Sequence, residues 1–156
     1  MSYTALMGFD FGTHRIGIAV GQAVTCTASA LTTLAARDGI PDWAALGRVI
    51  EEWQPDAFVV GIALHMDGSE SEMARRARTF GNRVSGRFGR PWHPFDERLS
   101  SFEAKEWADE LGRGRHGRRP VVDDLAARLI LQSWMESDGL HWLRESHQET
   151  DRPLRP

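Results

Sequence analysis

Three groups of acidic residues are placed in this 156-residue chain where carboxylates can do chemistry. Asp10 lies inside an apolar, glycine-containing stretch at residues 6–12, where a lone carboxylate is costly unless it is paired or binds a cation. Asp96 and Glu97 follow a predicted strand, and ligands of open α/β sheets gather outside strand carboxyl ends. Asp123 and Asp124 open a predicted helix, where an aspartate also serves as an ordinary N-cap.

If these three groups converge, their charges need compensation. Two carboxylates 4 Å apart repel by about 4 kcal/mol at an effective dielectric constant near 20, so protons or divalent cations must be present. A site made of carboxylate oxygens suits Mg²⁺ or Mn²⁺. Two such ions about 4 Å apart form a known arrangement for phosphodiester cleavage. The acidic groups therefore predict a metal-dependent hydrolase with two ions.

Basic residues gather in the second half of the chain. Residues 75–119 hold 12 basic and 6 acidic residues, whereas the remainder holds 7 basic and 16 acidic ones, which gives the net charge of -3. All basic residues but Lys105 are arginines, whose planar fork matches phosphate oxygens. The glycine-rich segment 112–120 contributes Arg113, Arg115, Arg118 and Arg119, and Arg15 and Arg98 lie beside the acidic groups. We expect these six arginines to bind the phosphates of a nucleic acid. Segment 112–120 also fits a solvated loop, and Arg15 and Arg98 also fit a role as partners of a carboxylate in the site.

The remaining elements follow from apolar patterning. Strands are predicted at 5–12, 15–21, 28–34, 57–62 and 91–95. Helices are predicted at 41–53, from 67–70 to about 88, at 100–112 and at 121–143. An early hairpin followed by strand–helix alternation indicates an α/β fold, a mixed five-stranded sheet with antiparallel strands 1–3, then parallel strands, and helices on both faces. We expect one domain at 1–143 and a disordered polar tail at 144–156.

Composition excludes several classes of protein. The 41% hydrophobic content suffices for a core, and no apolar run reaches the roughly 18 residues of a membrane span. The single Cys26 permits no internal disulfide, and we see no signal peptide, so a soluble cytoplasmic protein is expected. Trp43 and Trp53 are expected in the core. Four histidines lack metal-ligand spacing and are expected in loops or on the surface: His14, His65, His93 and His116.

Four motifs in order resemble the YqgF family of bacterial proteins. They read GFDFGTHRIG at 8–17, VVGIALHMDGSE at 59–70, DERLS at 96–100 and VDDLAA at 122–127. The resemblance spans residues 6–134 and departs from the family pattern at Ile62, Ala63, His65 and Ser71. These departures affect substrate contacts and loop geometry rather than the acidic residues.

The resemblance implies a ribonuclease H-like fold related to RuvC-type junction resolvases. It also implies a nuclease that matures the 5′ end of pre-16S rRNA during ribosome biogenesis, with the ribosomal particle as a possible partner. Carried onto this sequence, the catalytic and metal-binding residues are Asp10, Glu97 and Asp123, with Asp124 as the alternative to Asp123.

Three other functions are compatible with parts of the sequence. The family relation also fits a Holliday-junction DNA resolvase, and vestigial acids would leave a non-catalytic RNA-binding assembly factor. The segment DFGT at 10–13 is similar to the phosphate-binding turn of actin-like ATPases, but those proteins need two such domains and this chain has room for one.

Overall fold

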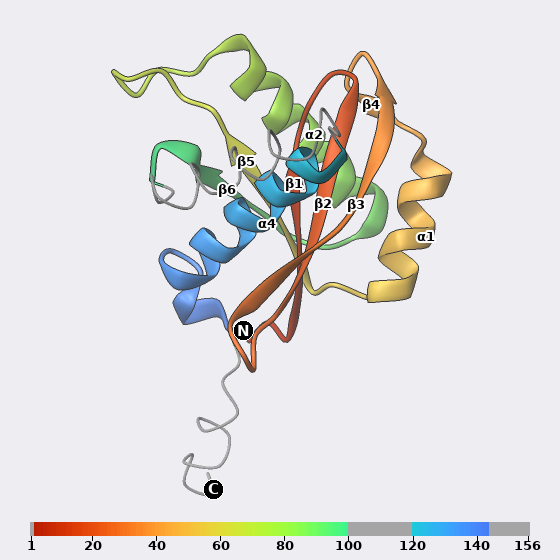
Figure 1. Cartoon of the computed structure of the whole chain (residues 1–156), viewed down its shortest axis with the longest axis vertical. Helices are drawn as coiled ribbons and strands as arrows, with labels where there is room; N and C mark the ends of the chain where they lie inside the picture. The colour runs from red at the N-terminus through yellow and green to blue at the C-terminus, as the bar shows by residue number, and fades with distance from the viewer. Residues whose placement is uncertain (1, 100–119, 144–156) are drawn as a thin grey trace, which may run out of the picture.

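A six-stranded mixed sheet forms the centre of the molecule in the computed structural model, which describes residues 2–99 and 120–143, with backbone only at 120–124 (Figure 1). The strands are β1 (Ala5–Asp10), β2 (Arg15–Gln22), β3 (Thr27–Arg37), β4 (Ile40–Pro41), β5 (Ala57–Ile62) and β6 (Trp92–Asp96). Their order is β4-β3-β2-β1-β5-β6; neighbouring strands among β1–β4 are antiparallel, while β5 is parallel to β1 and β6 to β5.

This sheet confirms the predicted mixed α/β architecture and corrects its strand count from five to six. The additional strand is β4, which pairs with the end of β3 through Arg37 and Ile40. Asp38 and Gly39 make the tight turn between them with positive φ angles of 50° and 80°. Two residues are too few to show an alternating pattern, and the pair Asp38-Gly39, which favours a two-residue hairpin turn, is the signal for this strand that sequence reasoning missed.

Helices cover both faces of the sheet. Helices α1 (Trp43–Trp53) and α2 (Glu72–Phe88) lie on one face, and α4 (Pro120–Glu136) lies on the other (Figure 1). Short 3₁₀ turns occur at η1 (Glu97–Leu99) and η2 (Leu140–Trp142). Along β1, Met7 and Phe9 pack toward α1 and α2, whereas Leu6 packs toward α4. Because strand side chains alternate between faces, Gly8 and Asp10 share the α4 face with Leu6.

The second helix begins later than its sequence suggested. Residues 67–70 are not a helix start: the Asp67 carboxylate accepts hydrogen bonds from the Ser69 backbone N–H at 2.9 Å and from its hydroxyl at 2.6 Å, which makes a local turn. Ser71 is the N-cap of α2, accepting from the Ala74 N–H at 3.0 Å. An aspartate-led turn and a capping box share the same residue types, so sequence alone did not separate them.

The last helix is shorter than predicted, ending at Glu136 instead of residue 143. The Gly139 N–H donates to the Trp134 carbonyl at 2.7 Å, and a side chain at Gly139 would collide with the Trp134 ring. The chain therefore turns at Gly139 and continues into η2. The predicted helix 100–112, the segment 112–119 and the tail 144–156 lie outside the described residues.

Two predictions about side chains with rings, those for Trp53 and His93, need correction. Trp43 packs beside the core against Phe80 as expected, but Trp53 is 36% exposed at the end of α1. His93 is not a surface residue: it is half-buried on β6 beside Trp134, and Tyr3 Oη is hydrogen-bonded to its Nε2 at 2.9 Å. The His93 side chain is thus part of the packing between the sheet and α4.

This packing predicts a pH dependence of stability. Burial, and then the charge of nearby His141, lower the pKa of His93 below its ordinary value near 6.5. The unfolded chain therefore binds the proton more tightly than the folded one, so the stability due to neutral His93 is complete above pH 6.5 and is lost as the pH falls through the lower folded pKa. We expect the free energy of unfolding to fall between pH 7.5 and 5, and His93→Phe to make this fall smaller. Urea unfolding at several pH values measures it; an unchanged pH dependence in His93→Phe, or an equal change in the exposed His14→Phe, would contradict the assignment.

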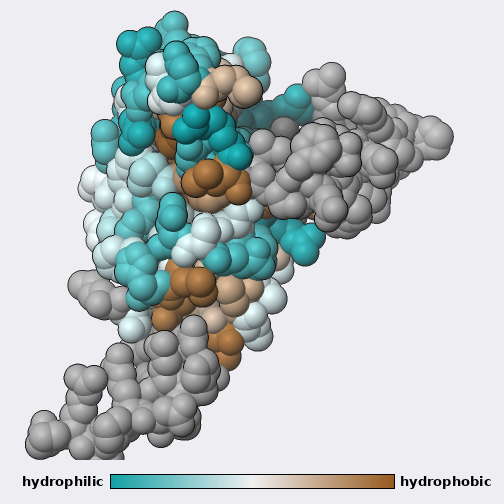
Figure 2. All heavy atoms as spheres, turned by 90° about the vertical axis from the view of Figure 1, so that its left-hand side faces the viewer, coloured by the Kyte–Doolittle hydropathy of each residue, from teal (hydrophilic) through white to brown (hydrophobic). Residues whose placement is uncertain are grey.

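Most large apolar side chains lie between these layers. The described atoms visible in Figure 2 are mainly hydrophilic, and the apolar ones form small separate patches. In the described part of the chain, we find no helix with the length and apolarity of a membrane span.

Candidate active site

Asp10 lies at the carboxyl end of β1, at the edge where parallel strands commonly place functional groups. The parallel register pairs Phe9 with Val60, which puts Asp10 beside Gly61 of β5. Asp10 is half-buried and shares the α4 face of the sheet. Strand pairing on both sides, with β2 and with β5, fixes the backbone that carries this carboxylate.

Glu97 reaches the same place from the other neighbour of β5. The register pairs Gly61 with Phe95 of β6, and η1 begins at Glu97 directly after that strand. A Cβ built on Gly61 would lie 3.2 Å from the carboxyl carbon of Glu97 and 2.5 Å from the terminal methyl of Ile130 on α4. Gly61 thus provides, by lacking a side chain, the space that the half-buried Glu97 carboxyl group and α4 occupy. Asp10 and Glu97 are therefore brought to opposite sides of one glycine.

The first turn of α4 lies at the same edge. A Cβ on Gly8 would lie 2.7 Å from Leu131 Cβ and 3.3 Å from the Ala127 carbonyl oxygen, so the helix packs closely on β1. At the far end, Tyr3 bridges to Leu143, so α4 runs opposite to β1 and begins near the strand's carboxyl end. Asp123 and Asp124 occupy this first turn. Their side chains lie outside the described atoms, so the third acidic position stays a prediction.

These residues fit a site for divalent cations. Asp10 and Glu97 supply carboxylate oxygens, the donors that Mg²⁺ and Mn²⁺ prefer, with a side-chain-free position between them. Among the described side chains, no three His, Cys, Asp or Glu residues cluster to hold an ion. A complete site would therefore need a ligand from the first turn of α4, where the sequence predicts one.

Arg98 binds a carboxylate in this structure. Its guanidinium contacts both Asp96 carboxylate oxygens, with the Nη2–Oδ2 distance at 2.7 Å, and Nη1 donates to the carbonyls of His65 and Met66 at 3.4 and 3.2 Å. The hydrogen bonds to Asp96 raise the pKa of Arg98. Of the two roles considered for Arg98, partnering a carboxylate is the one observed, and it ties the turn that carries Glu97 to the loop after β5.

The other predicted phosphate-binding arginines are less fully described. Arg15 is exposed at the start of β2, on the hairpin that follows Asp10, and its backbone packs closely against Gly12. The remaining four, Arg113, Arg115, Arg118 and Arg119, lie outside the described residues.

Gly61 is the site residue that sequence reasoning missed. It lies in the apolar run of β5, where a glycine indicates the close approach of another group. Gly8 in β1, against which α4 packs, carries the same signal.

A mixed sheet of this order with helices on both faces is a ribonuclease H-like fold. The structure titled "T. thermophilus RuvC in complex with Holliday junction substrate" has this fold, with a TM-score of 0.51 and 19% identity over 85% of this chain and 95% of that chain.

The chain belongs to the RuvX (YqgF) family, whose model, described as Holliday junction resolvase, matches residues 4–137. A protein of Saccharophagus degradans named "putative pre-16S rRNA nuclease" is 54% identical over 86% of this chain and 94% of its own length. A protein of Chromohalobacter salexigens with the same name is 53% identical over 85% of this chain and 90% of its own length. This membership confirms the family resemblance and the prediction of an enzyme that hydrolyses phosphodiester bonds.

Proposed function

We propose that this protein is a metal-dependent nuclease that matures the 5′ end of pre-16S rRNA during ribosome biogenesis in the cytoplasm. The observation that carries the proposal is the placement of Asp10 and Glu97 on either side of Gly61, at the edge where α4 begins. The names of relatives about half identical to this chain supply the substrate class.

In this proposal, Asp10, Glu97 and Asp123, or Asp124 in its place, hold two Mg²⁺ or Mn²⁺ ions. When bound, such ions activate a water molecule and stabilise the leaving oxygen. The surrounding residues of the protein hold the acidic side chains in fixed positions. Strand pairing fixes Asp10, while the Asp96–Arg98 ion pair fixes the turn that begins with Glu97. Arg15 and the four arginines of segment 113–119 position the substrate phosphates.

Cleavage of matched substrates tests this function. The purified protein is incubated with pre-16S rRNA, free or within a ribosomal particle, and with a four-way DNA junction of equal molarity, in Mg²⁺ or in EDTA. We expect Mg²⁺-dependent release of the mature 5′ end, mapped by primer extension, and little cutting of the junction. Faster, paired cutting of the junction would favour the DNA resolvase, which the family description makes the second candidate. Tight RNA binding without cleavage in any metal would identify a non-catalytic assembly factor.

A further inference from the structure

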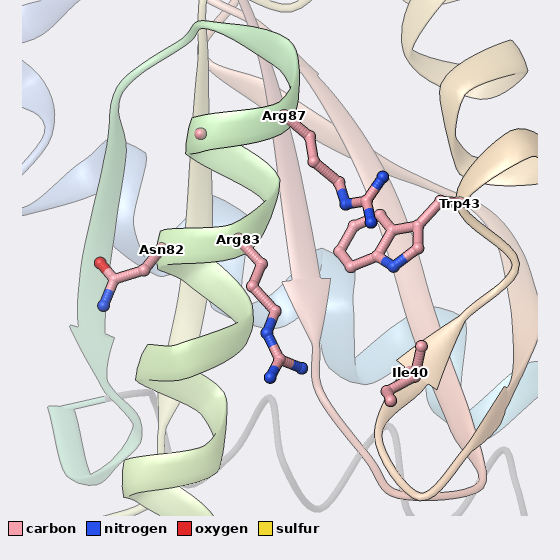
Figure 3. A pocket seen from close by; sticks show the side chains of 6 residues that line it. Ile40, Trp43, Asn82, Arg83 and Arg87 are labelled. Carbon is pink, nitrogen blue, oxygen red and sulfur yellow. The ribbon is translucent and has the colours of Figure 1, made fainter.

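A groove runs along α2 on the face of the sheet opposite α4. Its largest hollow, about 610 Å³, lies between α2 and the start of α1 (Figure 3). It is lined by Ile40, Trp43, Asn82, Arg83, Gly86 and Arg87. A second hollow shares Ile40 and Arg83 with it, and a third shares Arg76 and Thr79 with the second. We call this continuous surface the α2 groove.

The α2 groove has an excess of positive charge. Its lining holds four arginines, Arg75, Arg76, Arg83 and Arg87, against two acids, Asp38 and Glu72. Arg76 is bound to Asp38, with an Nη2–Oδ1 distance of 2.7 Å. The described residues place no carboxylate within ion-pair distance of the other three arginines. Three of the arginines and Thr79 follow one another at a spacing of four residues along α2: Arg75, Thr79, Arg83 and Arg87. This spacing places successive side chains about 6 Å apart along one face of the helix.

One of these arginines is held in place by an aromatic ring. The guanidinium carbon of Arg87 lies 4.3 Å from the centre of the Trp43 ring, and Figure 3 shows Arg87 reaching over that ring while Arg83 extends beside it from the preceding turn. Trp43 is itself stacked on Phe80, at 6.2 Å between ring centres. A guanidinium ordered in this way loses less side-chain entropy when it binds an anion.

The α2 groove begins at the edge of the sheet where β1 ends with Asp10. Phe11, which follows Asp10 directly, lines its middle hollow, and Arg75 lies in the first turns of α2, shortly after β5 has ended near Gly61. From there the arginines lead away from the acids along the length of α2. A polyanion bound at the acidic site can therefore continue along this row.

We propose that the α2 groove binds the phosphate backbone of the single RNA strand that flanks the cut, an inference that rests on the proposed function. A row of guanidiniums suits repeated phosphates, and the lining offers a single partly covered indole with few groups for reading bases, so this contact is independent of sequence. It extends the substrate path from the edge of the sheet that carries Asp10 along the length of α2.

The salt dependence of RNA binding tests this proposal. The double variant Arg83→Gln/Arg87→Gln is compared with Arg37→Gln/Arg48→Gln, which removes two exposed arginines outside the groove lining. Binding of a single-stranded RNA long enough to span α2 is measured in EDTA at several salt concentrations. Because each phosphate contact contributes roughly 0.7 to the log–log slope, we expect the groove variant to lose about 1.4 of slope and the control to keep the parental slope.

The outcomes separate this inference from the nuclease function, because binding in EDTA does not depend on cleavage. A parental slope in the groove variant, or an equal loss in both variants, would overturn the RNA-strand assignment. So would a groove variant that retains RNA binding but loses affinity for polyglutamate, since the surface would then serve an acidic protein. Loss of slope in the groove variant, together with absent cleavage by the parental protein, would keep the groove as an RNA site and reject the nuclease.

Discussion

Asp10→Asn should reduce Mg²⁺-dependent RNA cleavage by at least about 10³-fold while leaving the protein folded. Metal ions contribute several kcal/mol of transition-state stabilisation, and each 1.36 kcal/mol is worth a factor of ten in rate. An amide at this half-buried position keeps the shape of the side chain but removes the charge that would hold a cation beside Glu97. Single-turnover cleavage of pre-16S rRNA measures the loss.

The matched control is Asp138→Asn, the same change at an exposed carboxylate in the turn after α4. It should cleave at the parental rate. Thermal unfolding provides a second measurement. Mg²⁺ or Mn²⁺ should raise the melting temperature of the parental protein and of Asp138→Asn, and should raise the melting temperature of Asp10→Asn much less. Parental cleavage by Asp10→Asn would remove the acids from the mechanism altogether.

Gly61→Ala should lower cleavage by up to about 10-fold through a single methyl group. The new Cβ would lie 2.5 Å from the Ile130 terminal methyl and 3.2 Å from the carboxyl carbon of Glu97. Ile130 is 3% exposed and has little room to move away from the new methyl group, and the Glu97 carboxyl group must shift by a few tenths of an ångström. A displacement of about 1 Å at a catalytic group can cost about 10²-fold in rate, so this smaller shift is expected to cost up to about 10-fold. Overpacking costs about 1–3 kcal/mol of stability.

Gly47→Ala on α1 is the control for this change. Its Cβ would meet only Phe88, at an ordinary 3.4 Å, and alanine is favoured over glycine inside a helix by roughly 1 kcal/mol. We expect this variant to be as stable as the parent or more so, with unchanged cleavage. Both variants should bind RNA in EDTA as the parent does; a Gly61→Ala protein that cleaves normally would show that Glu97 needs no fixed position.

Together, these two variants address separate properties of the acidic site. Asp10→Asn removes a charge without changing shape, whereas Gly61→Ala changes shape without removing a charge. The ion pair between Asp96 and Arg98 belongs with the second property, because it holds the turn after β6 in place. If both predictions hold, the site requires the acidic ligands and also the space between them.

Most elements of the fold, and the types of residue at its acidic edge, can be predicted from local sequence patterns. Local patterns predict these elements without information about the rest of the fold. For example, β5 has an unbroken apolar run, and α1 has apolar residues at helical spacing. The chain's motifs were sufficient to identify the family, which the family model confirms.

Which side chains meet in the folded protein cannot be predicted from these local patterns. The parallel register of β1, β5 and β6 placed Asp10 and Glu97 beside Gly61. Packing between distant segments brought Arg98 to the carbonyls of His65 and Met66, and Arg76 to Asp38. The α2 groove likewise depends on Trp43 and Arg87 meeting from separate helices. The physical reason is that a sequence pattern records which face of its own element a residue occupies, whereas strand register and helix packing choose the partner from a distant part of the chain.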